Sequence, residues 1–325
     1  IYSHGIGQLQ TDGHDKRCSG PGRTGIKPIG NGMQPSRDSG VAQNGFTPGR
    51  LTNTCTVECA RNPVPFTRAS SADLSGKRAV VTGASLGIGQ AVVKELADMG
   101  ADVIFCARNQ EPVDSLGGYL GKVTGLTADM GDKVSTESFL DAVDTFGGAD
   151  ILVNNVGASP SRNFLYMSDD EWKDLFELNL MSAVRCTQRL LPEMRKKKWG
   201  RIVMVASGAA KYPSAALIDY GATKAAMLSI SKSLSRKYGA DGVLVNSVLP
   251  GLIHTAMWER AASEIAEANE TSMEKVIERN GRTVPVGRYG TSEEVAAVIA
   301  FLCSNAAGYV NGVSLEVDGG SGAHI

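Results

Sequence analysis

Tyr220 and Lys224 are four residues apart in Tyr-Gly-Ala-Thr-Lys, and Ser207 ends an apolar run thirteen residues upstream of Tyr220. Residues i and i+4 share a helix face, so the Lys224 ammonium can lie beside the Tyr220 ring. A nearby positive charge lowers the pKa of a phenol, and a shift from about 10 to near 7 needs about 4 kcal/mol. Tyr220 can then donate a proton to a carbonyl oxygen that also accepts from Ser207. The Tyr-x-x-x-Lys pair alone is a weak motif, so its context decides.

A glycine-rich turn lies upstream of this group. The β-branched run from Lys77 to Thr82 is followed by Gly83, Gly87 and Gly89, and a helical pattern begins at residue 88. This order predicts a strand, a tight turn and a helix whose N-terminal amides attract a pyrophosphate. The spacing G-x-x-x-G-x-G departs from G-x-G-x-x-G, and such a turn can also be purely structural.

Apolar runs alternate with amphipathic segments from residue 78 onward. The runs predict seven strands, at 78–82, 102–107, 122–127, 150–154, 201–206, 243–248 and 313–317. Helical patterns separate most of them, at 88–99, 133–146, 169–197, 220–238 and 292–303. We therefore predict an α/β fold in a single domain, a doubly wound seven-stranded parallel sheet of the Rossmann type. Ligands of such sheets lie at the carboxyl ends of the strands, where Ser207 and Tyr220 can meet.

The composition restricts the class of protein. Hydrophobic residues make up 42% and charged residues 21%, which is typical of a globular chain. A net charge of -1 gives no reason to expect nucleic acid, and no apolar stretch approaches the roughly 18 residues that cross a membrane. No Cys/His cluster has metal-ligand spacing, so we predict no metal, and we expect Cys106, Cys186 and Cys303 to be buried thiols in a reducing compartment.

Residues 1–70 differ from the rest. They hold 11 of the 38 Gly and 6 of the 12 Pro, without a sustained apolar period. We predict a disordered N-terminal extension followed by a catalytic domain at 71–325. We interpret the extension as translated upstream sequence rather than an organelle-targeting segment, because Asp12, Asp15 and Asp38 fit a transit peptide poorly. The expected location is the cytoplasm, or an organelle if the extension is a targeting segment.

Considered together, these motifs resemble the short-chain dehydrogenase/reductase family. Order and spacing match over residues 74–320 at Thr82–Gly89, Asn154–Gly157, Asn179, Ser207, Tyr220, Lys224 and Pro250-Gly251. The resemblance implies an oxidoreductase that moves a hydride between NADP(H) and a ketone or secondary alcohol. It implies Tyr220 as general acid/base, Ser207 as the group that polarises the oxygen, Lys224 as ligand of the nicotinamide ribose, and Asn179 as holder of a relay water.

The resemblance also implies which residues bind the cofactor. Ala107 stands where relatives that use NAD place Asp, and Arg108 offers a guanidinium for a 2′-phosphate, so we predict NADP(H). Leu86 occupies a turn position that is often basic in relatives that use NADP, and Val156 replaces the usual Ala. The implied contacts are the turn residues Gly83, Ser85, Leu86, Gly87, Ile88 and Gly89; Arg108 at the 2′-phosphate; Asp129 and Met130 at adenine; Asn155 and Gly157 at the ribose; Tyr220 and Lys224; and Pro250, Gly251, Ile253 and Thr255 at the carboxamide.

Specificity is expected in three segments, 158–166, 208–219 and 256–282. The last is predicted to be a lid with a helical period, in which Met257 and Trp258 meet either an apolar substrate or the core. We favour a small free ketone or alcohol as substrate.

Two alternatives remain open at this stage. One is reduction of a 3-oxoacyl group on an acyl carrier protein, because the basic run 195–198 could meet that acidic partner. Asp241 argues against it, since carrier-reading relatives tend to have a basic residue there. The other is a non-catalytic dinucleotide sensor, although Ser207, Tyr220 and Lys224 are all retained. The resemblance further implies a homotetramer packed through helices around 169–197 and 220–238.

Overall fold

A single parallel sheet forms the centre of the protein. The computed structural model describes residues 71–160 and 162–322, so the extension predicted for 1–70 lies outside the described residues. The sheet has the seven parallel strands that the sequence predicts, and their order is β3-β2-β1-β4-β5-β6-β7. Each strand begins and ends within two residues of its predicted bounds: β1 (Arg78–Val81), β2 (Asp102–Ala107), β3 (Val123–Thr127), β4 (Ile151–Asn154), β5 (Gly200–Val205), β6 (Val243–Pro250) and β7 (Ser314–Val317).

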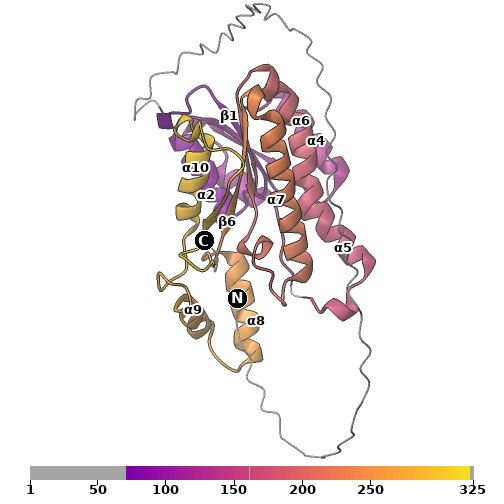
Figure 1. Cartoon of the computed structure of the whole chain (residues 1–325), viewed down its shortest axis with the longest axis vertical. Coiled ribbons are helices and arrows are strands. Elements are labelled where there is room, and N and C mark those ends of the chain that lie inside the picture. The colour runs from indigo at the N-terminus through magenta and orange to yellow at the C-terminus, as the bar shows by residue number, and fades with distance from the viewer. Residues whose placement is uncertain (1–70, 161, 323–325) are drawn as a thin grey trace, which may run out of the picture. The chain divides into compact units, whose positions relative to one another are not determined.

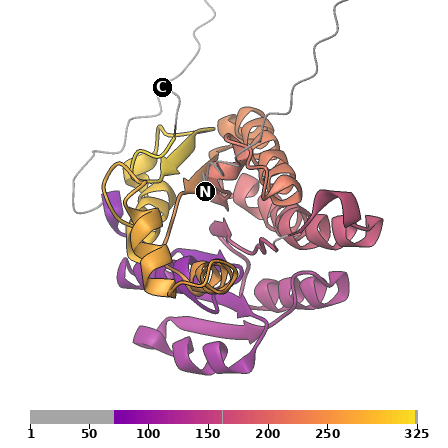
Figure 2. The same ribbon diagram turned by 90° about the horizontal axis from the view of Figure 1, so that it is seen from below.

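Helices cover both faces of this sheet (Figure 1, Figure 2). One face carries α2 (Gly87–Asp98), α3 (Gln110–Leu116) and α10 (Ser292–Cys303). The other carries α4 (Lys133–Thr145), α6 (Ser182–Lys196) and α7 (Ile218–Tyr238). Along each strand the side chains alternate between the two cores. In β1, Val81 enters the first core, whereas Val80 enters the second and pairs in register with Ile104 and Leu152.

The chain order reverses between β1 and β4, which are neighbours in the sheet. Strands β2 and β3 lie beyond β1 on one side, and β5, β6 and β7 lie beyond β4 on the other. In open α/β sheets, ligands bind at the carboxyl ends of the strands next to such a reversal. The fold therefore directs attention to the segments that follow β1, β4 and β5.

The helix predicted over 169–197 is interrupted. It consists of α5 (Asp169–Phe176), the π-helical turn η3 (Glu177–Met181) and α6. A π turn adds one residue to a helical turn, which a nearly continuous amphipathic pattern does not reveal. Helix α3 was not predicted, because its seven residues include Pro112 and bury only Val113 and Leu116. The remaining short turns are the 3-10 segments η1 (Tyr119–Gly121), η2 (Phe164–Tyr166), η4 (Gly208–Ala210), η5 (Gly239–Asp241) and η6 (Asn305–Ala307).

The predicted lid contains two helices, α8 (Ala256–Ala268) and α9 (Met273–Gly281). They pack on one another through a small apolar core of their own, centred on Ala262, Ala266 and Val276. The ring of Trp258 packs edge-on against Tyr289 with centroids 5.6 Å apart, which favours the core interpretation for this residue. The side chain of Met257 lies outside the described part of the chain.

Two further observations concern the described residues. Cys106, Cys186 and Cys303 are free and buried, as predicted, and burial raises the pKa of each thiol. Between residues 71 and 322, leaving out 161, no helix has the length and apolar character needed to cross a bilayer, and no group of side chains is arranged to ligate a metal.

Candidate active site

The fold brings Ser207, Tyr220 and Lys224 together at the carboxyl end of β5. Ser207 follows this strand by two residues, and the other two lie on the first turns of α7. The Lys224 Nζ atom is 5.8 Å from the centroid of the Tyr220 ring and donates a hydrogen bond of 2.9 Å to the Val205 carbonyl. Ser207 hydrogen-bonds to Tyr220. The three side chains thus meet at one edge of the sheet, where Ser207 and Tyr220 can reach one substrate oxygen.

Burial controls the protonation of this group. Loss of water around Tyr220 raises the pKa of its phenol, and the hydrogen bond with Ser207 acts in the opposite direction. Burial also disfavours the charged form of Lys224, and it lowers the pKa of this ammonium to about 8. The lowered pKa predicted for Tyr220 is therefore wrong for the protein alone, because desolvation disfavours the phenolate more than an ammonium at this separation favours it. A raised pKa keeps Tyr220 protonated at neutral pH, which is the state that can donate a proton.

Asn179 connects the segment after β4 with the first turns of α7. It is fully buried on η3, where its Oδ1 accepts from the Ala158 amide at 2.8 Å and its Nδ2 donates to the Ala158 carbonyl at 3.0 Å. Nδ2 also donates to Thr223 Oγ1 at 3.1 Å, and this hydroxyl donates to the Tyr220 carbonyl at 2.7 Å. Asn179 therefore ties the segment after β4 to the turn that carries Tyr220. Its relay role stays a prediction.

Gly157 provides the room for this arrangement. A Cβ atom at this position would lie 3.0 Å from Lys224 Nζ and 3.4 Å from Asn179 Oδ1. The ammonium would have to shift by a few tenths of an ångström to admit an Ala. The Gly of Asn-Asn-Val-Gly thus leaves the Lys224 ammonium the space that a side chain would take.

The turn after β1 has the features of an anion cradle. Gly83 and Gly87 have φ values of +70° and +60°, in the left-handed region that favours glycine. A Cβ atom on Gly89 would lie 2.5 Å from the Gly83 carbonyl and from Asn155 Nδ2. Helix α2 begins here without a capping side chain and without an acid in its first turn. Its free amides and positive dipole fit the pyrophosphate of a dinucleotide.

The other predicted cofactor residues gather at the same edge. Asn155 donates to the carbonyls of Thr82 and Gly83, so it stabilises the cradle directly. Arg108 and Asp129 are exposed just beyond the ends of β2 and β3. The Met130 side chain is only 1% exposed and belongs to the core, so only its backbone can meet a ligand.

The segment after β6 lies beside the cradle, because a Cβ atom on Gly87 would lie 3.1 Å from Thr255 Cγ2. The Thr255 hydroxyl caps α8 by accepting from the Trp258 amide at 3.4 Å. Ile253 is buried, which leaves its backbone for a carboxamide. Leu86 is 61% exposed at the cradle rim. Ser85, Ile88 and Gly251 are half-buried, and Pro250 is buried as the last residue of β6.

Three residues of this region were not predicted. Thr223 could have been found, because position i+3 from Tyr220 shares its helix face. Asp219 and Arg162 form an ion pair beside Tyr220 and are 57 positions apart in the sequence. No local pattern marks such a pair.

Residues 77–280 match the family model of the short chain dehydrogenases. The chain belongs to this family. The matched range contains the anion cradle, Asn179, Ser207, Tyr220 and Lys224. The predicted family, fold class and oxidoreductase activity are thus confirmed.

Curated relatives support the assignment of this short-chain dehydrogenase. An uncharacterized oxidoreductase of Bacillus subtilis, YvrD, is 39% identical over 255 residues, which cover 76% of this chain and 97% of the relative. The 3-oxoacyl-(acyl-carrier-protein) reductase FabG of Salmonella typhimurium is 39% identical over 247 residues, or 75% and 97% of the two chains.

Solved structures agree. L-sorbose reductase of Gluconobacter frateurii, complexed with NADPH and L-sorbose, superposes with a TM-score of 0.74 at 34% identity and covers 78% of this chain and 100% of its own. Actinorhodin polyketide ketoreductase with NADPH gives 0.72 at 31% identity, over 76% and 98% of the two chains. Both structures hold the cofactor that the sequence predicted for this chain.

The contact between Gly83 and Val156 predicts a stability difference. A Cβ atom on Gly83 would lie 2.8 Å from Val156 Cγ2, whereas one on Gly76, at a similar φ of +75°, meets nothing within 4 Å. Gly83→Ala should therefore cost about 1–3 kcal/mol more unfolding free energy than Gly76→Ala, because overpacking adds to shared backbone strain. Urea unfolding measures both values. Adding Val156→Ala should recover part of the difference; equal losses in the two Ala variants would contradict the packing argument.

Burial of Lys224 predicts a pH-dependent stability. Its folded pKa of about 8 lies below the 10.5 of a free lysine, so the folded state binds fewer protons than the unfolded state between these values. From about pH 8 to 10.5, the wild type should gain up to about 3 kcal/mol of unfolding free energy relative to Lys224→Met. Below pH 8 the full cost of the buried ammonium persists. Chemical denaturation across this range measures the difference, with exposed Lys232→Met on the same helix as control; a flat difference for Lys224 would refute it.

Proposed function

We propose that this chain interconverts a ketone and a secondary alcohol with NADP(H), using Tyr220 as general acid/base. The observation that carries the proposal is the meeting of Ser207, Tyr220 and Lys224 at the same sheet edge as the anion cradle. The fold and the ketoreductase neighbours support it.

The proposed mechanism assigns one task to each side chain. When bound, NADP(H) supplies the hydride to the carbonyl carbon or takes it from the alcohol. Tyr220 gives its proton to the substrate oxygen during reduction, and Ser207 donates a hydrogen bond that holds and polarises this oxygen. Lys224 binds the nicotinamide ribose and stabilises the tyrosinate that remains. Asn179 holds a water from which Tyr220 regains its proton.

Tyr220→Phe tests the mechanism. General acid catalysis contributes about 10²- to 10⁴-fold, so turnover should fall by this factor. NADPH affinity, measured by fluorescence titration, should change little. Tyr119→Phe, which removes a hydroxyl that hydrogen-bonds to Asp98, is the control and should keep full turnover. Near-normal turnover of Tyr220→Phe would overturn the mechanism, and cofactor binding without turnover of any ketone by the wild type would favour the sensor alternative.

The choice of NADP(H) is proposed to rest on the end of β2. Ala107 there is buried and offers no carboxylate to ribose hydroxyls, while the neighbouring Arg108 is exposed and free to meet a 2′-phosphate. The NADPH complexes of the similar sorbose and actinorhodin reductases support this choice.

Arg108→Asp should reverse the preference. The carboxylate repels a 2′-phosphate and accepts from ribose hydroxyls, so kcat/KM with NADPH should fall by about 10-fold or more, and that with NADH should rise. Steady-state kinetics with both cofactors measure the change. Arg189→Asp, at an exposed arginine on α6, is a control for the added negative charge. An NADP preference equal to that of the wild type would remove Arg108 from the proposal.

A small free ketone or alcohol is the favoured substrate. The basic run that was considered for an acyl carrier protein is fully occupied: Asp241 accepts from Arg195 at 2.7 Å and from Lys198 at 2.9 Å, and Lys196 and Lys197 pair with Glu193 and Asp150. This run joins α6 to the amino end of β5, whereas Tyr220 lies at the carboxyl edge. The 3-oxoacyl-carrier alternative retains support from the FabG relatives. The homotetramer, the carrier partner and the cytoplasmic location stay predictions.

A further inference from the structure

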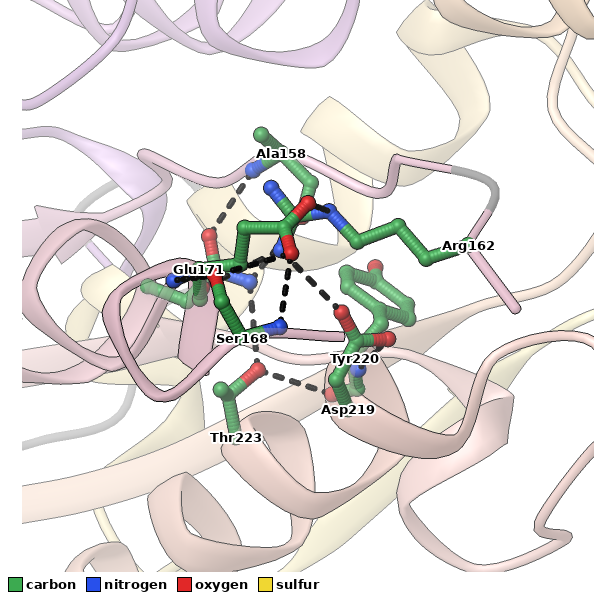
Figure 3. A network of polar contacts seen from close by, with 8 residues as sticks. Ala158, Arg162, Ser168, Glu171, Asp219, Tyr220 and Thr223 are labelled. Atoms are coloured by element: carbon green, nitrogen blue, oxygen red, sulfur yellow. Dashed lines mark hydrogen bonds and ion pairs between the residues drawn. The ribbon is translucent and has the colours of Figure 1, made fainter. Parts of the chain in front are cut away.

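Arg162 lies in the loop after β4 and reaches the helix that carries Tyr220 (Figure 3). Its Nη1 atom is 3.5 Å from Asp219 Oδ2 and donates to the Glu171 carbonyl at 3.1 Å. Its Nε atom is 3.5 Å from Glu171 Oε1. The guanidinium therefore stands between two carboxylates, one on α5 and one on α7.

Asp219 is the more deeply buried of the two carboxylates. Its side chain is 3% exposed, whereas that of Glu171 is 43% exposed. A buried carboxylate is costly unless a cation or several donors satisfy it. Within the described residues, the backbone amide of Tyr220 also donates to Asp219, at 2.8 Å from Oδ1. Arg162 therefore balances a charge that is bonded directly to the backbone of the proposed acid.

Asp219 lies where a negative charge stabilises the start of α7. Helix α7 begins after Leu217 without a capping side chain, and Asp219 is the acid of its first turn. A negative charge there stabilises the free amides of the helix N-terminus. Tyr220 lies in the same turn, where helices fray unless anchored.

We propose that Arg162 is a positioning residue that, through Asp219, fixes the first turn of α7 and hence the direction of the Tyr220 hydroxyl. The inference rests on the proposed role of Tyr220. Asn179 on η3 holds this turn through the Thr223 hydroxyl, and Arg162 holds it from the loop after β4. The pair also joins two of the segments in which specificity is expected, so a substrate that enters beside residues 158–166 meets a loop already fixed to the acid.

The test is a double-mutant cycle of Arg162→Ala and Asp219→Asn in the full chain. Arg162→Ala leaves a buried carboxylate without its cation next to Tyr220, and kcat for ketone reduction should fall about 10-fold, which corresponds to about 1.4 kcal/mol of activation free energy. The KM for NADPH should not change. The double variant should regain most of the loss, because no unpaired charge remains. Arg162→Lys should also recover part of kcat, since it keeps the charge.

Arg189→Ala is the matched control. Arg189 also bridges two carboxylates, Asp141 and Asp144, but on the outer surface of α4 and α6. It should keep full kcat. The inference is overturned if Arg162→Ala behaves like this control, if the double variant is no better than Arg162→Ala, or if only the ketone KM rises, which would make Arg162 a substrate contact. Thermal unfolding and NADPH titration verify that each variant folds.

Tyr220→Phe in the same assay distinguishes failure of the positioning role of Arg162 from failure of the proposed function. If this variant is inactive and Arg162→Ala has normal kcat, the positioning role fails while the proposed function stands. If Tyr220→Phe remains active, the proposed function itself fails.

Discussion

The buried ammonium of Lys224 is the interaction on which the rest of the site depends. It is 2% exposed, and within the described residues its oxygen partner is the Val205 carbonyl at 2.9 Å. A charge this deep is tolerated only where a strong acceptor meets it. The end of β5 supplies that acceptor, and Gly157 leaves the space. The bond of the ammonium to this carbonyl, together with the packing of Met227 and Leu234 at the second core, holds α7 so that Tyr220, one turn earlier, faces the same edge.

The backbone segments at this edge lie so close together that glycine serves both packing and ligand binding. The strands β1, β4 and β5 end side by side, and the segments that leave them compete for space. A side chain on Gly83 would meet Val156, and one on Gly89 would meet Asn155. The glycines that solve this packing problem also leave the first amides of α2 unobstructed for an anion. Packing and ligand binding therefore favour glycine at the same positions of the sequence.

Sequence patterns predicted those features that depend on local residues. The strands are recovered almost to the residue, because β-branched runs buried on both faces are distinctive, and the spacing of Tyr220 and Lys224 places them on one helix face. What escaped prediction depends on tertiary context. Spacing does not report how much water surrounds a phenol, so the direction of the Tyr220 pKa was wrong. The pair of Arg162 and Asp219 joins distant loops, and the π turn at Asn179 lies inside an apparently regular amphipathic pattern.

Burial, rather than ion pairing, prepares the site for proton transfer. It raises the pKa of Tyr220 and lowers that of Lys224 to about 8, so the order of the two groups is inverted and the phenol holds its proton more tightly than the ammonium does. The neutral phenol is the stable form until a substrate oxygen draws its proton away. The tyrosinate then forms beside an ammonium in a region of low dielectric, where their attraction is much stronger than in solvent. The same desolvation that opposes ionisation in the resting protein thus strengthens the stabilisation of the charge that the reaction creates. The arrangement works only if bulk water stays out, leaving the single relay water proposed at Asn179, which gives the segments that cover Tyr220, including the loop held by Arg162, a role in the chemistry.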